Sequence, residues 1–180
     1  MASYYYLAAS LTDLKFDAPL PNTTEDFLAS CRFALSSKHY RLVEACAFGH
    51  PIADSSHPFI AAWNQFDRVF TASLVVQRSL KLKKDVPLLW SEQKRDKGVD
   101  EAVKEALLAA NPLEMELALM KLAWQEADRL KALKVFELEV FLAYAIQLRI
   151  LERKALFVQA SGEQEFKRLF VEMESHNRSI

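Results

Sequence analysis

The stretch VFLAYAI, residues 140–146, decides the fold, because a helix with this sequence has no polar face. It lies within residues 134–157, a run that predicts the most hydrophobic helix of the chain. A helix that is apolar all round must be buried on several sides. The C-terminal half of the run carries Arg149, Arg153 and Lys154, and basic side chains are favoured at this end of a helix. We therefore expect residues 134–157 to form the central helix.

Six further stretches carry helix start signals. These signals are Thr23–Thr24, Ser37, Pro58, Asp100, Asn111–Pro112 and Ser161. Ser, Thr, Asp and Asn cap helices, and Pro is tolerated in a first turn. The Pro58 helix is predicted to reach about Lys81 and the last helix to reach Met173. No stretch alternates apolar and polar residues between turn signals, so we predict one all-α domain over residues 1–180, bundle-like, with about six to eight helices and no sheet.

An aromatic stripe marks the helix that is predicted to begin at Pro58. Its members are Phe59, Trp63, Phe66, Phe70 and Leu74, at spacings of four, three, four and four. Residues at these spacings share one helix face. We expect this face to pack into the core rather than to line a groove.

Residues 83–100 are the expected linker. They contain one Pro, one Gly and many charges, a composition typical of loops. Lys83 and Lys84 belong to a local basic patch that acidic residues interrupt. This patch is either a solvated loop or a docking surface for an acidic partner, and the sequence leaves both interpretations open.

The composition of the chain excludes several classes of protein. Lys and Arg number 23 against 24 Asp and Glu, so the basic excess typical of nucleic-acid binding is missing. Three Gly in 180 residues argue against a glycine-rich phosphate loop, and two Cys cannot build a disulfide framework. The chain has no apolar run long enough to span a membrane and no basic residue ahead of its first apolar run. We expect a cytoplasmic protein that does not insert into a membrane.

The titratable and nucleophilic residues form no recognisable catalytic motif. Cys46, His50 and His57 have a loosely metal-like spacing, but a structural zinc site requires four ligands, usually in close pairs. Glu137 and Glu139 could perform acid–base chemistry, yet they lie two residues apart and so on different helix faces. The chain has neither a G-x-S-x-G elbow nor a Walker-type phosphate loop. We expect no enzyme activity, no metal site and no cofactor.

Stretches near both ends of the chain carry a family resemblance. They are YYYLAASL (4–11), Phe16 with Ala18–Pro21, EDFLASCRFALS (25–36), FELEVFLAYAIQLRILERKALF (136–157) and the S-G-E-x-E-F run (161–166). Together they resemble an uncharacterised bacterial family that is encoded beside V-type (A/V-type) ATP synthase genes. The resemblance lies in helix faces rather than in catalytic residues.

A more distant similarity is to the C-type (or d-type) stalk subunits of V-type ATPases. That family has a Tyr-rich N-terminal helix and a late helix with an acid–apolar–Ala-Tyr pattern, which Glu139, Ala143 and Tyr144 match here. The similarity implies an all-α, non-catalytic piece that seats the central stalk on the membrane rotor. Members of that family are longer and built of three helical repeats, so 180 residues correspond to only part of one.

The resemblance predicts a non-catalytic subunit or accessory factor of a V-type ATP synthase, attached to the membrane through the rotor or central-stalk subunits. The candidate partner contacts are Tyr4, Tyr5, Tyr6, Lys83, Lys84, Glu139 and Tyr144. Three adjacent tyrosines on a helix cannot all face one core, so we expect them to be exposed. The alternative is a stand-alone helical adaptor or homodimer that binds another protein through an apolar face.

Overall fold

A computed structural model describes residues 4–52, 57–87, 90, 96–131 and 133–157. Over these residues the chain forms seven helices and no strand, which confirms the predicted all-α fold. The helices are α1 (Tyr5–Ser10), α2 (Thr24–Ala34), α3 (Ser37–Phe48), α4 (Pro58–Lys81), α6 (Lys97–Ala106), α7 (Pro112–Lys131) and α8 (Leu138–Ala155).

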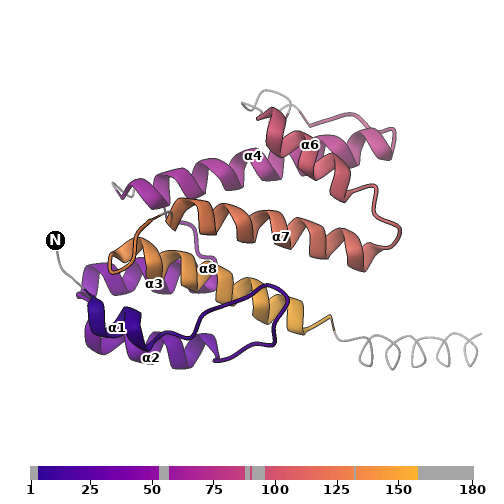
Figure 1. The fold of residues 1–180 in the computed structure, drawn as a ribbon. Coiled ribbons are helices and arrows are strands. Elements are labelled where there is room, and N and C mark those ends of the chain that lie inside the picture. Colours follow the sequence, from indigo (N-terminus) through magenta and orange to yellow (C-terminus); the bar gives the residue numbers. More distant parts are fainter. Residues whose placement is uncertain (1–3, 53–56, 88–89, 91–95, 132, 158–180) are drawn as a thin grey trace, which may run out of the picture.

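The helices stack in layers around α8 and α7 (Figure 1). Helix α8 packs against α3 and α2 on one side and against α7 on the other. Helix α7 in turn packs against α4 and α6, which also contact each other. Helix α8 is therefore the central helix that its apolar sequence predicts, and α7 separates it from the α4–α6 pair.

The main core surrounds α8. Every residue from Phe141 to Leu148 is buried, and Phe141, Leu142 and Ile146 have no exposed surface. Val43 of α3 and Ile60 of α4 belong to the same cluster. A second, smaller cluster lies between α6, α7 and the C-terminal half of α4; it consists of Val103, Ala106, Leu107 and Leu119, with Phe70 and Leu74 packed against it.

Local capping explains where several helices begin. The Thr23 hydroxyl accepts a hydrogen bond from the Asp26 amide at 3.1 Å, and the Asp26 carboxylate accepts one from the Thr23 amide at 3.3 Å. This reciprocal pair satisfies two amides that the first turn of α2 leaves without partners. Pro58 stands in the first turn of α4, and the Asn111 side chain accepts from the Glu114 amide at 2.8 Å at the start of α7. These starts, and the end of α4 at Lys81, agree with the sequence prediction.

Helix α8 is shorter than the predicted 134–157. It begins at Leu138, because the Phe136 carbonyl accepts a hydrogen bond from the Tyr4 amide at 3.1 Å and Glu137 is extended. A carbonyl bound to another element cannot continue the helix ladder. Helix α8 ends at Ala155.

Helix α6 begins earlier than predicted. Its cap is Asp96, whose carboxylate accepts from the Val99 amide at 3.1 Å. Asp100, the expected cap, lies inside the helix and accepts a hydrogen bond from the Ser73 hydroxyl of α4. The predicted linker 83–100 is therefore wrong at its end, where residues 97–100 are helical.

Two smaller corrections concern α3 and the C-terminus. The cap of α3 is Ser36, one residue before the predicted Ser37, and it accepts from the His39 amide at 3.3 Å. The helix predicted between Ser161 and Met173 lies outside the described residues, as do positions 88–89 and 91–95 of the expected linker.

Candidate functional site

A groove of about 480 Å³ lies between α4 and α8, with α7 as its floor. Its lining residues are Trp63, Phe66, Asp67, Phe70, Leu74, Arg78, Glu116, Leu119, Met120, Ala123, Arg149, Ile150 and Arg153. The groove arises because α4 and α8 both pack on α7 and stand on either side of it. Its walls combine aromatic rings from α4 with guanidinium groups from α4 and α8.

The aromatic wall is the stripe that the sequence predicts to face the core. Trp63 and Phe66 have ring centroids 5.4 Å apart, and Phe66 stacks on Phe70 at 5.5 Å. Phe66 is buried, but Trp63 and Phe70 are only half-buried. The expectation is correct for Phe59, which lies in the main core. It is wrong for the rest of the stripe, which faces partly into the groove, because α7 holds α8 away from this part of α4.

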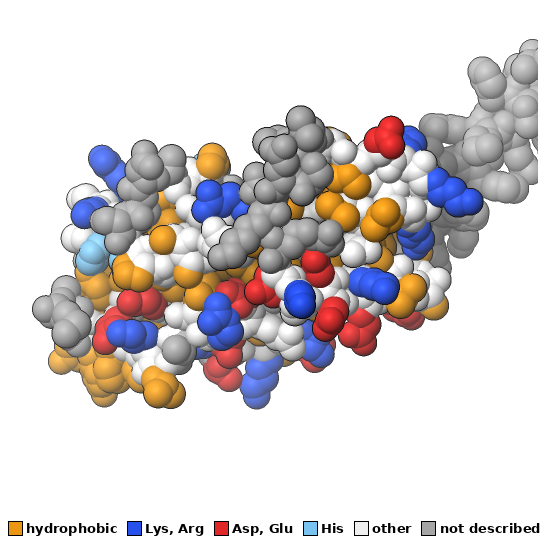
Figure 2. Space-filling model, turned by 90° about the horizontal axis from the view of Figure 1, so that it is seen from above, with side chains coloured by type: hydrophobic (Ala, Val, Ile, Leu, Met, Phe, Trp, Pro, Cys, Tyr) orange, Lys and Arg blue, Asp and Glu red, His pale blue; other side chains and the backbone are white. Residues whose placement is uncertain are grey.

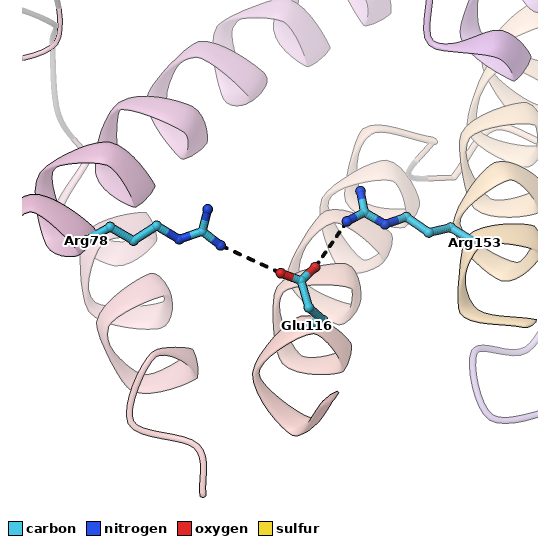
Figure 3. A network of polar contacts seen from close by, with 3 residues as sticks. All are labelled: Arg78, Glu116 and Arg153. Carbon is cyan, nitrogen blue, oxygen red and sulfur yellow. Dashed lines mark hydrogen bonds and ion pairs between the residues drawn. The ribbon is translucent and has the colours of Figure 1, made fainter. Parts of the chain in front are cut away.

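An ion-pair network closes one end of the groove (Figure 3). The Glu116 carboxylate of α7 lies 3.6 Å from an Arg78 nitrogen of α4 and 3.1 Å from an Arg153 nitrogen of α8. Both arginines stand in the C-terminal part of their helices and Glu116 stands near the start of α7, so each charge has the sign that its helix end favours. Pairs as exposed as these stabilise the fold only weakly, yet they connect all three walls.

Arg149 lies one turn before Arg153 and is held against the C-terminus of α3. A Cβ atom on Gly49 would lie 2.2 Å from a guanidinium nitrogen of Arg149, and Gly49 has a φ of +68°. A side chain at position 49 would therefore be strained and would collide with Arg149. Glycine leaves room for the guanidinium between α3 and the groove.

The Arg149 guanidinium is partly desolvated. Burial lowers its pKa; Cys46 and Asp67 act in the opposite direction, and Arg153 adds to the lowering. Arg149 forms no hydrogen bond or ion pair within the described part of the chain. A cation of this kind favours an anionic partner.

A second surface lies where α1 begins. Tyr5 is 53% exposed and Tyr6 is 88% exposed, and their ring centroids are 5.6 Å apart. The Tyr5 ring also contacts Phe136 at 4.8 Å, and Leu133 and Val135 are exposed in the same turn before α8. We call Tyr5, Tyr6, Leu133, Val135 and Phe136 the tyrosine patch. Hydrophobic side chains gather at this end of the molecule (Figure 2).

Two of the predicted contacts are structural instead. Tyr4 is half-buried; its hydroxyl shares a 2.6 Å hydrogen bond with Nδ1 of His39, and its ring packs edge-on against Phe141 at 5.7 Å. Tyr144 is buried against Phe27 at a ring distance of 4.8 Å, and burial raises the pKa of its hydroxyl. The expectation of exposure is thus correct for Tyr5 and Tyr6 and wrong for Tyr4, which faces the core.

The other predicted contacts do not join the tyrosine patch. Glu139 is half-buried in the first turn of α8 and does not line the groove. Lys83 and Lys84 are exposed beyond the C-terminus of α4, at the opposite end of the molecule from α1 (Figure 1). Lys83 has a φ of +52°, and the Lys83 and Lys84 amides bond back to the Leu80 and Ser79 carbonyls to terminate α4.

Among the described residues, no three His, Cys, Asp or Glu side chains gather in a way that could hold a metal ion. None of the described helices combines the length and the apolar character needed to cross a bilayer. Comparisons with protein-family models, with curated proteins and with solved structures gave no match. The candidate sites are therefore argued from their own geometry.

Proposed function

We propose that this protein is a non-catalytic subunit or accessory factor of a V-type ATP synthase, and that it binds its partner subunit through the tyrosine patch. The proposal rests on the family resemblance of residues 4–11 and 136–157. One observation carries it: these two stretches meet at the patch, where the Tyr4 amide bonds the Phe136 carbonyl at 3.1 Å. Aromatic side chains grouped on a surface are typical anchors of protein interfaces.

The way in which α8 is held supports a coupling role. Its Glu152 carboxylate accepts a hydrogen bond from the Thr24 amide at 2.7 Å, and its Lys154 ammonium donates to the Phe16 carbonyl. The same ammonium lies 4.6 Å from the centre of the Phe16 ring. A protein that transmits force between other subunits needs such connected helices, because a loose helix would absorb the movement.

The proposed location follows from the proposed role. The protein would lie on the cytoplasmic side and reach the membrane through the rotor or central-stalk subunits. The tyrosine patch would be covered in the complex, which explains why large apolar side chains are exposed in the isolated chain.

A stand-alone adaptor or a homodimer is the second candidate. The same patch favours it, since a second copy could cover Tyr5, Tyr6 and Phe136 in a symmetric interface. Sedimentation of the pure protein separates the candidates. A monomer agrees with a missing synthase partner, whereas a tight dimer that Tyr5→Ser/Tyr6→Ser dissociates favours the homodimer.

The test is a pull-down of tagged protein from detergent-solubilised native membranes that are shown to contain intact synthase. Stoichiometric recovery of rotor or stalk subunits supports a permanent subunit, and traces of them support an assembly factor. Absence of these subunits from the eluate contradicts the proposal.

Variants connect the pull-down to the patch. Tyr5→Ser/Tyr6→Ser should lower the recovery about tenfold, because truncated anchors dominate the loss of binding. Leu108→Ser is the control, since Leu108 is 77% exposed in the turn after α6 and lies outside the patch. Tyr4 is left intact, because its bond to His39 would confuse a loss of folding with a loss of contact.

A further inference from the structure

We propose that the groove between α4 and α8 binds a small amphiphilic anion: an acidic head group on a flat aromatic body. The head group would lie against Arg149 and the body against the rings of Trp63 and Phe70. This site is separate from the tyrosine patch and would have its own ligand.

Charge is the first argument. The groove is lined by the guanidiniums of Arg78, Arg149 and Arg153 and by the carboxylates of Asp67 and Glu116, which leaves an excess of one positive charge. Glu116 is shared between two of these arginines. Arg149 is left without an ion pair among the described residues, on the side of the groove where α3 already excludes water. A carboxylate, phosphate or sulfonate can take two parallel hydrogen bonds from a guanidinium.

The apolar walls are the second argument. Trp63, Phe66 and Phe70 form a continuous row of rings on α4, and Leu119, Met120 and Ile150 face them from α7 and α8. Flat rings prefer to stack or to meet edge-on with such a row. A groove of about 480 Å³ is within the size range of small-molecule sites.

The ion pairs at one end argue against a peptide helix as the ligand. Glu116 connects to Arg78 on one wall and to Arg153 on the other, so the network spans the groove (Figure 3). A helix lying along the groove would have to break these pairs to pass. A small molecule fits beside Arg149 without disturbing them.

The probe for the test is 8-anilinonaphthalene-1-sulfonate, an aromatic anion whose fluorescence rises in apolar sites. Its uncharged counterpart, N-phenyl-1-naphthylamine, has the same ring body without the sulfonate. We expect the wild-type protein to bind the anion more tightly than the neutral dye. Loss of the charged contact in Arg149→Met should weaken the anion about tenfold and leave the neutral dye almost unchanged.

Matched variants place the dye. Arg68→Met removes an exposed arginine of the same helix α4 outside the groove, and it should change neither affinity. Asp67→Asn removes an exposed carboxylate from the groove wall and should tighten the anion about threefold, which keeps the test valid if Arg149→Met fails to fold. Ala123→Phe fills the floor and should weaken both dyes.

Three results would overturn the proposal. Equal loss of both dyes in Arg149→Met would leave an apolar cavity without anion recognition. Loss of the anion in Tyr5→Ser/Tyr6→Ser, with Arg149→Met unaffected, would move the dye to the tyrosine patch. No saturable binding of the anion to the folded wild-type protein would also contradict it. None of these outcomes depends on whether the synthase is recovered in the pull-down.

Discussion

The two halves of α8 are held in different ways. From Phe141 to Leu148 the helix is buried on all sides and apolar packing alone holds it. From Arg149 onward, long polar side chains reach away to four different places: Gly49, Thr24, Glu116 and Phe16. The first half fixes the position of the helix in the core. The second half fixes its neighbours, and it leaves the Arg149 charge available to the groove.

Removing apolar contact from the first half should have the largest effect. Phe141→Ala deletes a ring that has no exposed surface and that touches Tyr4, so we expect a loss of about 3–5 kcal/mol in the free energy of unfolding. Urea denaturation followed by circular dichroism measures it. Phe33→Ala is the matched control, because Phe33 is 92% exposed and its truncation should stay within about 0.5 kcal/mol. Similar losses for the two variants would contradict the buried position of Phe141.

The two thiols test burial on the α2 and α3 side of α8. Burial raises the pKa of Cys31 and of Cys46 from 9.0 to about 12, with Arg149 partly offsetting the shift at Cys46. Between pH 9 and 12 the unfolded chain loses these protons while the folded chain keeps them. The free energy of unfolding should therefore decrease as the pH rises through this range.

Urea midpoints at several alkaline pH values measure this decrease. The Cys31→Ala/Cys46→Ala variant should lose part of the pH dependence. Burial also raises the pKa of Tyr144, which acts in the same direction, so a remainder is expected. An unchanged pH dependence in the variant would show that the thiols are not the buried groups responsible.

A change at Gly49 tests the second half of α8. Gly49→Ala places a Cβ in a left-handed conformation and against the Arg149 guanidinium, so we expect a loss of about 1–2 kcal/mol. Gly98→Ala is the control, because that glycine lies within helix α6 and a Cβ there meets only the Asp96 side chain at 3.3 Å. The control should lose no stability. A neutral Gly49→Ala would mean that Arg149 is not held against α3.

The smallest effect is expected at the end of the groove. Arg153→Met removes one guanidinium from Glu116, and its side chain is 63% exposed, so we expect a loss below about 1 kcal/mol. Chemical denaturation measures it, with Arg68→Met as the comparison. A loss as large as that of Phe141→Ala would show that charge rather than packing holds this half of the helix.

The sequence predicts the core of this protein better than its surfaces. The apolar run 140–146, the caps at Thr23 and Asn111 and the proline at position 58 are local signals, and the helices that they predict are present. The starts of α8 and α6 differ from the prediction, because a bond from Tyr4 to Phe136 and a cap at Asp96 override the local pattern.

The groove could not be predicted from the aromatic stripe. Spacing shows that Phe66 and Phe70 share a helix face, but only the placement of α7 between α4 and α8 leaves this face partly open. One signal was present in the sequence: Arg149 directly follows a run of buried residues, and an arginine so placed needs a neighbour or a ligand. The burial of Tyr4 could not be predicted either, because its contact with His39 joins distant parts of the chain.

The most direct test of the proposed function is site-specific photocrosslinking in native membranes. A benzoylphenylalanine in place of Tyr6 should crosslink to a rotor or stalk subunit of the synthase, because Tyr6 is 88% exposed in the patch. The same group in place of Leu108 should give no such product. Equal crosslinking from both positions, or none from position 6 in membranes that contain intact synthase, would contradict the account.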